Sequence, residues 1–362
     1  MIGLSHVEFS EEAAEDVKKL VLEGKVGQTE VIERFEQEFA RWVGSKYAIA
    51  VANGTLADTI AMATLSNYWE GKNEVIMPAL TFAAQVNAVI HAGLKPVFLD
   101  VLPSGLLNVN DHRINVNRNT LCFFPVHLLG RVSTVPSYDS KHLPVVEDAC
   151  EALGSQFRSR KVGTWGSIGT FSFFPSHTIT TGEGGMIVTD DAIYAEFCRR
   201  LRNHSKISST EFHFDMIGWN AKMTSIQAML GIHGLKTIDD VIEKRRDNYL
   251  ALGGTEEEHE FVSPHGFPVM CETKYLRDQM MNKLRVNGVA CRNFFSSLPT
   301  QESAYKNLGY KKGDFPVAEK IGNCGLYVPC HQGLSEQDID KIKELINGEK
   351  ETPQTLQIGS VN

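Results

Sequence analysis

The chain lacks the features that would place it among disulfide-stapled, membrane-spanning or nucleic-acid-binding proteins. Its seven cysteines are odd in number and scattered, with no Cys-x-x-Cys pair, so neither a disulfide framework nor a zinc site is indicated. No uninterrupted apolar run is long enough to cross a bilayer. A formal net charge of −8 and the lack of a basic run argue against a nucleic-acid binder. Residues 1–12 are polar and charged, unlike a signal peptide, so we expect a cytoplasmic protein.

What remains is the composition of an ordinary soluble globular protein, with 42% hydrophobic and 22% charged residues in a chain of 362. Short apolar segments alternate with helical patterns, which predicts an α/β fold with a mostly parallel sheet and helices on both faces. Val31, Phe35 and Phe39 recur at helical spacing, and Gly44 is a natural stop for that helix. Strands are expected at residues 47–52, 74–77, 96–100, 121–126, 144–147, 169–173 and 186–189, with helices at residues 56–65 and 82–92.

The sequence also predicts a second, smaller domain. Residues 223–250 are expected to form one long helix or two consecutive helices, after which the composition becomes rich in glycine and glutamate. The last helix of the chain should open at Ser335, because Asp338 three residues later is close to a capping box. The predicted parts are a large domain at residues 1–250, a small α+β domain at residues 251–350 and a disordered tail at residues 351–362.

The most informative stretch is residues 171–185, Phe-Ser-Phe-Phe-Pro-Ser-His-Thr-Ile-Thr-Thr-Gly-Glu-Gly-Gly. It resembles the active-site strand and loop of the DegT/DnrJ/EryC1/StrS sugar aminotransferase family, a group of fold-type I enzymes that use pyridoxal phosphate (PLP). The resemblance covers nearly the whole chain and implies a mostly parallel, seven-stranded sheet flanked by helices. In ordinary members the position of His177 is a lysine that binds the cofactor as a Schiff base. Imidazole cannot form that bond, although it can move protons near neutral pH.

The residues expected to bind the cofactor phosphate follow from the same resemblance. Gly54 and Thr55 lie where a strand ends and a helix begins, a place where backbone amides can bind a phosphate. Such a turn is often only a turn, but the family uses the matching pair for the cofactor phosphate. Ser172, five residues before His177, matches a serine that binds the same phosphate. Asn220 matches an asparagine that reaches the phosphate of the neighbouring subunit, which implies a homodimer with shared active sites.

The residues around the cofactor ring are also implied. Asp148 follows an apolar strand and matches the aspartate that keeps the pyridine nitrogen protonated, so that the ring can accept electrons. An isolated aspartate there would read as a helix cap. Phe82 matches the aromatic residue that stacks on the ring, with simple core packing as the alternative. Glu151 stands where ordinary aminotransferases carry a glutamine that contacts the ring hydroxyl.

Two features favour a particular branch, the 3-dehydratases of 4-keto-6-deoxy nucleotide sugars, in which histidine replaces the lysine. These are His177 itself and the run Cys-Glu-Ala-Leu-Gly-Ser at residues 150–155, which resembles a dehydratase run. Residues 326–334 look instead like the general aminotransferase pattern, and Thr178 stands where a second dehydratase histidine is familiar. Only Cys198 follows before a long gap, so the iron–sulfur cluster of some dehydratases is not expected, and no metal site is predicted.

Three functions are therefore open. The first is 3-dehydration of a nucleotide-linked 4-keto-6-deoxyhexose by noncovalently held pyridoxamine phosphate (PMP), with His177 as the base and glutamate restoring the amine. The second is amino transfer to such a sugar from glutamate, with another group in place of the lysine; Lys222 is the nearest candidate. The third is a catalytically silent member of the family, which the survival of Thr55, Asp148 and the other contacts disfavours.

Other conspicuous residues have ordinary explanations. His127 matches a family loop beside the active site, but a structural role is at least as well supported. Arg199, Arg200 and Arg202 lie on an expected helix and are interpreted first as a solvated face, with a nucleotide diphosphate as their other conceivable partner.

Overall fold

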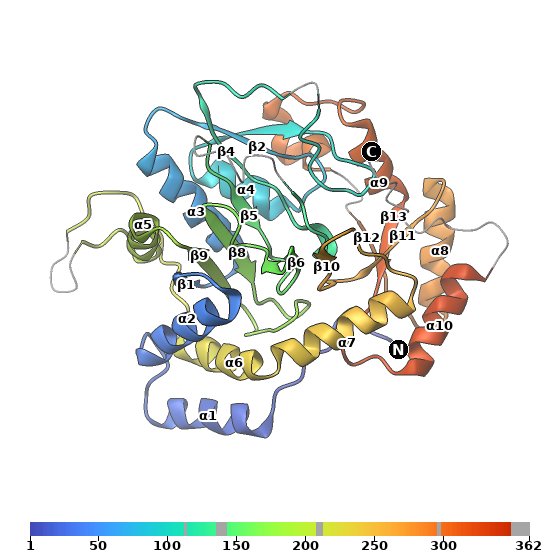
Figure 1. The fold of residues 1–362 in the computed structure, drawn as a ribbon, viewed down its shortest axis with the longest axis horizontal. Coiled ribbons are helices and arrows are strands. Elements are labelled where there is room, and N and C mark those ends of the chain that lie inside the picture. Colours follow the sequence, from blue (N-terminus) through green and yellow to red (C-terminus); the bar gives the residue numbers. More distant parts are fainter. Residues whose placement is uncertain (112–113, 135–142, 208–212, 295–297, 349–362) are drawn as a thin grey trace.

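The computed structural model describes residues 1–111, 114–134, 143–207, 213–294 and 298–348 (Figure 1). Seven central strands form two hydrogen-bonded sheets, one in the order β1-β9-β8-β5 and the other in the order β3-β2-β4. Isolated parallel bridges, Phe123 to Val145 and Val126 to Asp148, join the two sheets. The strands are β1 (Tyr47–Val51), β2 (Glu74–Pro78), β3 (Lys95–Leu99), β4 (Thr120–Phe123), β5 (Val146–Asp148), β8 (Ile168–Ser172) and β9 (Gly185–Thr189).

The direction of these strands is uniform except for β9. Both β1 and β8 pair with β9 in the antiparallel sense, whereas β5 with β8, and β2 with β3 and β4, are parallel pairs. Of these seven strands, β9 alone thus runs opposite to the rest. The mostly parallel sheet predicted from the sequence is present, with one reversed strand that the apolar pattern did not distinguish.

Strand β1 shows why helices cover both faces of the sheet. Its side chains alternate between the faces, as the twofold period of a strand requires. Ile49 packs in the same core cluster as residues of α3 and α5, whereas Ala48 packs with Phe35 and Phe39 of α2. Two hydrophobic cores, one on each face, therefore fix the sheet.

The helices of this large part begin and end close to where the sequence predicts. α2 ends at Gly44, whose φ of 90° is the left-handed conformation that glycine adopts without strain. The expected 223–250 segment is two consecutive helices that meet at Thr237. The helices are α1 (Glu11–Leu22), α2 (Glu30–Val43), α3 (Gly54–Tyr68), α4 (Ala83–His91), α5 (Ala192–Arg202), α6 (Ser225–Lys236) and α7 (Ile238–Ala251).

The C-terminal part is a small antiparallel sheet with helices beside it (Figure 1). Ser335 and Asp338 form the capping box predicted for the last helix. Contacts cross the predicted domain boundary: the amide of Ile2 donates to the carbonyl of Gly288 at 2.8 Å, and Phe315 packs in the core of the sheet. The division into domains stays a prediction, and residues 351–362 lie outside the described residues. The elements are β11 (Phe267–Met270), β12 (Arg292–Asn293), β13 (Gly325–Val328), α8 (Lys274–Val286), α9 (Pro316–Cys324) and α10 (Glu336–Asn347).

A second small sheet connects the two parts. Its strand order is β10-β6-β7, and all its pairings are antiparallel. Strand β10 follows α7 and precedes β11 of the C-terminal sheet. Its pairing with β6 therefore fixes the path of the chain between the two parts. The strands are β6 (Gln156–Phe157), β7 (Arg160–Lys161) and β10 (Glu260–Phe261).

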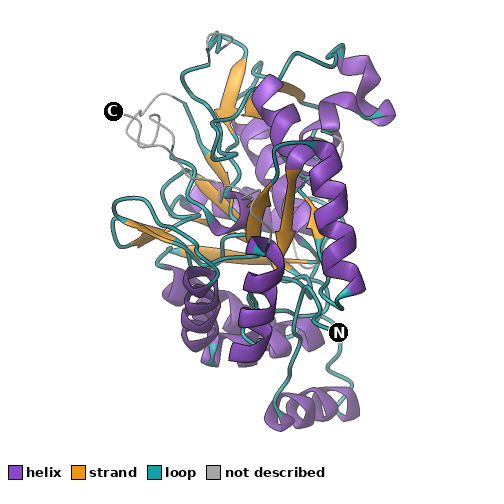
Figure 2. Ribbon diagram, turned by 90° about the vertical axis from the view of Figure 1, so that its right-hand side faces the viewer, coloured by secondary structure: helices purple, strands orange, loops and turns teal. Residues whose placement is uncertain are grey.

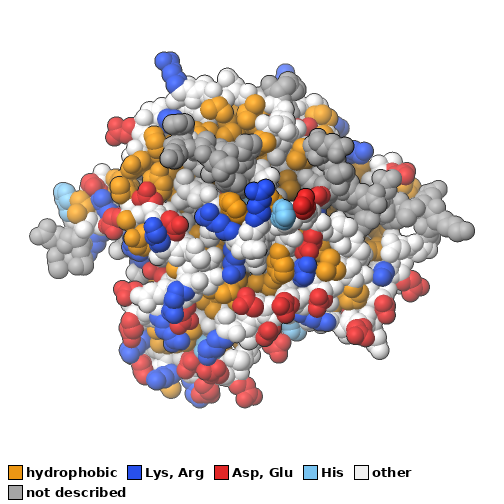
Figure 3. Space-filling view, in the orientation of Figure 1, with side chains coloured by type: hydrophobic (Ala, Val, Ile, Leu, Met, Phe, Trp, Pro, Cys, Tyr) orange, Lys and Arg blue, Asp and Glu red, His pale blue; other side chains and the backbone are white. Residues whose placement is uncertain are grey.

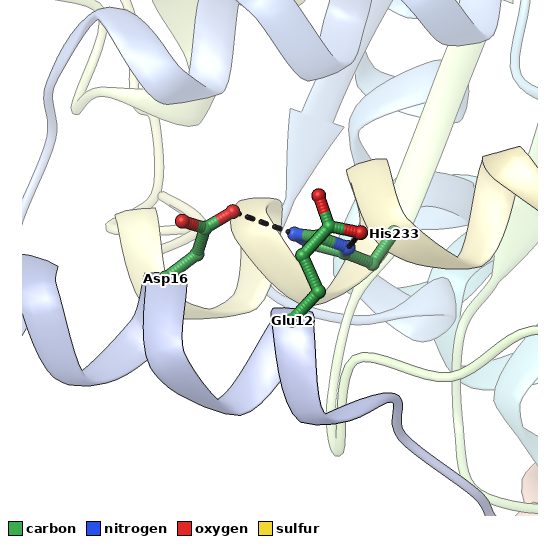
Figure 4. Close-up of side chains that lie close together, drawn as sticks. All are labelled: Glu12, Asp16 and His233. Atoms are coloured by element: carbon green, nitrogen blue, oxygen red, sulfur yellow. Dashed lines mark hydrogen bonds and ion pairs between the residues drawn. The ribbon is translucent and has the colours of Figure 1, made fainter.

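Helix α1 stands apart from the other helices in both ribbon views and is docked on α6 (Figures 1 and 2). Figure 4 shows the polar contact between them, where Glu12 and Asp16 of α1 point toward His233 of α6. Asp16 Oδ2 lies 2.9 Å from His233 Nε2, and Lys236 donates to Glu12 at 2.9 Å. Because these side chains satisfy one another, we interpret the group as a contact between helices.

The face in Figure 3 carries acidic and basic side chains intermixed over its lower half, where α1, α6 and α7 lie. This mixture differs from the one-signed stripe that tracks a nucleic-acid backbone. Within the described ranges, none of the helices has the length and apolar character needed to cross a bilayer.

The parallel strands bring the predicted site residues to one edge of the sheet. Asp148 is the last residue of β5, Ser172 is the last residue of β8, and Gly54 opens α3 shortly after β1. Because ligands of open α/β sheets gather beyond the carboxyl ends of the strands, this edge is where a site is expected.

Candidate active site

A cavity of about 580 Å³ opens at this edge of the sheet. It is walled by the start of α3, the ends of β5 and β8, the loop that carries His177, and residues from the small sheet. Every predicted site residue except Asn220 lines it: Gly54, Thr55, Phe82, Asp148, Glu151, Ser172 and His177. The structure thus brings together residues that are far apart in the sequence.

One end of the cavity is suited to a phosphate. The first turn of α3 presents backbone amides without partners in the helix, and Asn53 caps this turn by accepting from Leu56 N at 2.9 Å. A Cβ at Gly54 would lie 2.8 Å from Ser172 Cβ and 3.1 Å from Cys150 Sγ. Glycine is therefore required for the close approach of helix and strand, with the Ser172 hydroxyl beside it.

Two buried carboxyl groups, Asp148 and Asp58, lie close to the same turn, within 4.8 Å of Cys150 Sγ. Asp148 accepts a hydrogen bond from Cys150 N at 3.1 Å, and Asp58 accepts one from the Thr170 hydroxyl at 2.6 Å. Burial raises the pKa of Asp148, and burial together with the charge of Asp148 raises the pKa of Asp58 well above its usual value. Within the described residues, no lysine or arginine forms an ion pair with either group.

These observations fit a pyridine-based cofactor with a phosphate. A protonated ring nitrogen placed beside Asp148 would supply the positive charge that the carboxyl pair lacks. Asp58 was not identified from the sequence. The sequence did contain a signal for it, a single charged residue in the otherwise uncharged first half of α3. A helical segment of this kind faces the core, so its one charged side chain is expected to be buried.

Glu151 lies on the cavity wall and is fixed by a backbone contact. Its Oε2 atom accepts a hydrogen bond from Leu129 N at 2.9 Å. Burial raises the pKa of Glu151 to about 7; the Leu129 amide opposes this rise, and the charge of Asp148 adds to it. The side chain is therefore part protonated near neutral pH, which allows it to donate or accept a hydrogen bond.

Phe82 lies immediately before α4 and is 64% exposed. Simple core packing, the alternative considered from the sequence, does not describe a side chain with this exposure. Its position on the cavity wall is consistent with a stacking partner for a planar ligand.

His177 is held by its backbone, which leaves its ring available. Its amide donates to Phe174 O at 2.9 Å, and its carbonyl accepts from Arg245 Nη2 at 3.2 Å. Burial, with a smaller effect of the Arg245 charge, lowers the pKa of His177 to about 3. The imidazole is therefore neutral at pH 7 and can accept a proton.

A second histidine, His265, also lines the cavity and was not identified from the sequence. Its ring lies over that of His177 with centroids 5.0 Å apart and an angle of 49° between the planes. It belongs to the connection between β10 and β11, so only the tertiary fold brings it to this place. No spacing or motif around it offered a signal.

Asn220 and Lys222 lie outside the cavity lining. Lys222 donates to Asn203 Oδ1 at 3.2 Å and also contacts the Asn220 side chain. No lysine is among the described residues that line the cavity. Lys222 is therefore not placed, in this chain, to take over the role of the missing lysine.

The structure tests the ordinary explanations given above for His127 and for Arg202. His127 is fully buried, with Nε2 3.0 Å from Glu147 Oε2 and Nδ1 accepting from Ser133 N at 3.0 Å, so its role is structural. The solvated face proposed for the arginines is wrong for Arg202. Its guanidinium is largely buried and donates to Glu36 at 2.5 Å and to Ala50 O of β1 at 2.7 Å, because α5 packs beside β1.

Comparison with known proteins identifies the family. A model of the DegT/DnrJ/EryC1/StrS aminotransferase family matches residues 7–347, and the chain belongs to this family. GDP-perosamine synthase from Vibrio cholerae is 32% identical over 333 residues, 87% of this chain and 89% of that protein. GDP-4-keto-6-deoxy-D-mannose 3-dehydratase from Yersinia pseudotuberculosis is 27% identical over 380 residues, 94% of this chain and 95% of that protein. A solved GDP-4-keto-6-deoxymannose-3-dehydratase with a trapped PLP-glutamate geminal diamine has a TM-score of 0.86 and 24% identity, covering 95% of this chain and 100% of that chain.

These similarities confirm the predicted family, the fold-type I aminotransferase-like α/β fold and the PLP/PMP cofactor. The protein is an enzyme of a family that contains nucleotide-sugar aminotransferases and dehydratases. For the reaction itself, the names of the relatives support amino transfer, the alternative considered from the sequence, better than dehydration. The roles assigned to individual residues stay predictions.

Proposed function

We propose that this protein acts on a nucleotide-linked 4-keto-6-deoxyhexose with a noncovalently held PLP/PMP cofactor, and that it removes the hydroxyl at carbon 3. One observation carries the proposal: the residue facing the cavity at the Schiff-base position is His177, and no lysine is among the described residues that line the cavity. A site without that lysine cannot hold the cofactor covalently, whereas a neutral imidazole there can move a proton.

Five residues of the cavity have a role in this proposal. Gly54, Thr55 and Ser172 bind the cofactor phosphate, and Asp148 keeps the ring nitrogen protonated. When bound, the cofactor would supply an electron-accepting ring. An imidazole nitrogen of His177 removes the proton next to that ring and returns it to the departing hydroxyl, which leaves as water.

Amino transfer at carbon 4 is the second candidate. It is supported by the relatives that are named GDP-perosamine synthase. Glutamate is the amino donor we propose in either case, because a relative was solved with PLP and glutamate joined. Amino transfer by this chain would have to proceed without a covalent lysine, or with a lysine supplied from outside the described lining.

We also propose a homodimer with shared sites. Asn220 is exposed and absent from the lining of its own cavity, so the phosphate contact assigned to it would have to be made in a neighbouring copy. The same segment exposes Phe214 and Ile217, at 50% and 90%, which is suited to burial against a partner. Mixing an Asn220→Ala chain with a His177→Asn chain should restore part of the activity through hybrid sites. Full activity of a demonstrated monomer would contradict the shared site.

The reaction is tested by the mass of the sugar product. The protein is incubated with PMP, glutamate and GDP-, UDP- and dTDP-linked 4-keto-6-deoxyhexoses in turn. The proposal predicts a product in which the 3-hydroxyl is lost, and a loss of about 100- to 10,000-fold in rate for His177→Asn. A 4-amino sugar formed equally well by the native chain and by His177→Asn would establish the second candidate. A chain that binds the cofactor but changes none of these sugars would be the silent member.

A further inference from the structure

The cavity holds two imidazoles, and the proposed function uses only one. His265 and His177 come from different parts of the fold, one from the segment before β11 and the other from the loop after β8. Both rings line the cavity, and they lie against each other with centroids 5.0 Å apart. His265 is held in place by its backbone amide, which donates to Leu129 O at 3.4 Å.

Nδ1 of both His177 and His265 is buried and has no hydrogen-bond partner within the described residues. His331 also has such an Nδ1, but it lies outside the cavity lining, and its Nε2 donates to Gly3 O at 3.1 Å. His127, in contrast, satisfies both of its nitrogens with Glu147 and Ser133. Buried nitrogens without a partner are uncommon, and here two of them belong to rings that line one cavity.

The groups around the pair limit its charge to one proton. Arg245 of α7 and Arg292 of β12 act on His265 as positive charges, and Arg245 acts on His177 in the same way. The aromatic ring of Tyr327 of β13 lies 6.1 Å from that of His265, and Glu151 faces the same cavity. Burial lowers the pKa of both imidazoles, and protonation of His177 lowers that of His265 further. Two adjacent cations beside these arginines would repel strongly.

We propose that His265 is a second proton-transfer residue and that His177 and His265 act as a pair that carries one proton. The proposal rests on the proposed function for the identity of the substrate. Both rings begin neutral; His177 takes up one proton from carbon, and the pair then holds a single positive charge. His177 passes this proton to His265, which delivers it to the departing oxygen, so both rings end neutral and no proton is gained or lost overall. With two rings, the proton can be taken up at one place and delivered at another. A single ring would have to reach both places by itself.

The first test uses the cofactor-free protein and needs no sugar. The imidazole pKa values of native protein, His265→Asn and His177→Asn are measured by NMR of labelled histidine. His177→Asn should raise the pKa of His265, because it removes the neighbouring charge that lowers it, and the two native imidazoles should titrate in two separate steps. The exposed His91 at the end of α4 provides the control, since His91→Asn removes an imidazole outside the cavity lining. An unchanged pKa of His265 in His177→Asn would overturn the pair.

The second test separates proton uptake from proton delivery in the loaded enzyme. His265→Asn should retain exchange of solvent hydrogen at the carbon served by His177, while sugar product forms about 100- to 10,000-fold more slowly. His177→Asn should lose both. His265→Phe keeps a flat ring without nitrogens and should resemble His265→Asn. If His265→Phe turns over like the native protein, His265 only packs against His177 and the proposal fails. Because the NMR titration requires no turnover, failure of the proposed function can be distinguished from failure of the pair.

Discussion

Replacing Glu151 by glutamine should make the cofactor-free protein more stable, and more so at higher pH. Glutamine has nearly the same shape and keeps an oxygen that can accept from Leu129 N, the 2.9 Å contact of the native side chain. The substitution therefore removes the ionisable group while it preserves the hydrogen bond. The effect on the free energy of unfolding reports directly on the burial of this carboxyl.

The magnitude follows from the pKa of about 7 for Glu151 in the folded protein. An unfolded glutamate has a pKa of about 4.3, so the folded state binds the proton more tightly and loses stability as the pH rises between these values. The resulting penalty is about 1 kcal/mol at pH 5 and about 3.5 kcal/mol at pH 8. Glu151→Gln removes this penalty, so the difference in stability between variant and native protein should widen by about 2.5 kcal/mol over this interval.

The assay is urea denaturation of both proteins, without cofactor, at pH 5 and pH 8. Glu196→Gln in α5 is the matched control, because it makes the same chemical change at an exposed position and should alter stability by less than about 0.5 kcal/mol at either pH. A stability difference for Glu151→Gln that is constant or narrows toward pH 8 would refute the burial and pKa assigned to Glu151.

Three further predictions concern the residues around the cavity and the core beneath it. Gly54→Ala should weaken binding of PMP at least tenfold in a fluorescence titration, because the added Cβ would lie 2.8 Å from Ser172 Cβ. Gly27→Ala is the control: nothing lies within 4 Å of its added Cβ, so this variant should bind PMP as the native protein does. Arg245→Met should raise the pKa of His177, since the nearby positive charge lowers it, and should shift the acidic limb of the pH–rate profile to higher pH; an unmoved limb would contradict that contact. Arg202→Met should lower the free energy of unfolding, measured in urea, by about 3 kcal/mol or more, because it leaves the buried Glu36 without its cation. Glu38→Gln breaks an exposed ion pair in the same way, and an equal loss of stability in that variant would show that burial is irrelevant.

Much of the fold follows from local signals in the sequence. The apolar spacing of Val31, Phe35 and Phe39 and the left-handed Gly44 determine α2 and its end. The order of strands and helices follows from apolar alternation, because the side-chain periods of strand and helix differ. The reversed direction of β9 was not predictable in this way, since a strand has the same alternation in either direction.

The site residues show the same difference between local and long-range signals. Gly54, Asp148, Ser172 and His177 were found because they occur in short motifs next to the strands that position them. Asp58, His265 and the burial of Arg202 were missed, because their partners lie far away in the sequence. Arg202 and its partner Glu36, for example, are 166 residues apart, and no local pattern records such a pairing.

The proposed use of His177 in place of lysine is tested most directly by reduction with borohydride. The native protein and His177→Lys are loaded with PLP, reduced, digested and analysed by peptide mass. The account predicts that the native protein carries no cofactor on any peptide and loses it on dialysis, whereas His177→Lys retains the cofactor covalently at residue 177. Native protein that carries reduced cofactor on any lysine would contradict the account.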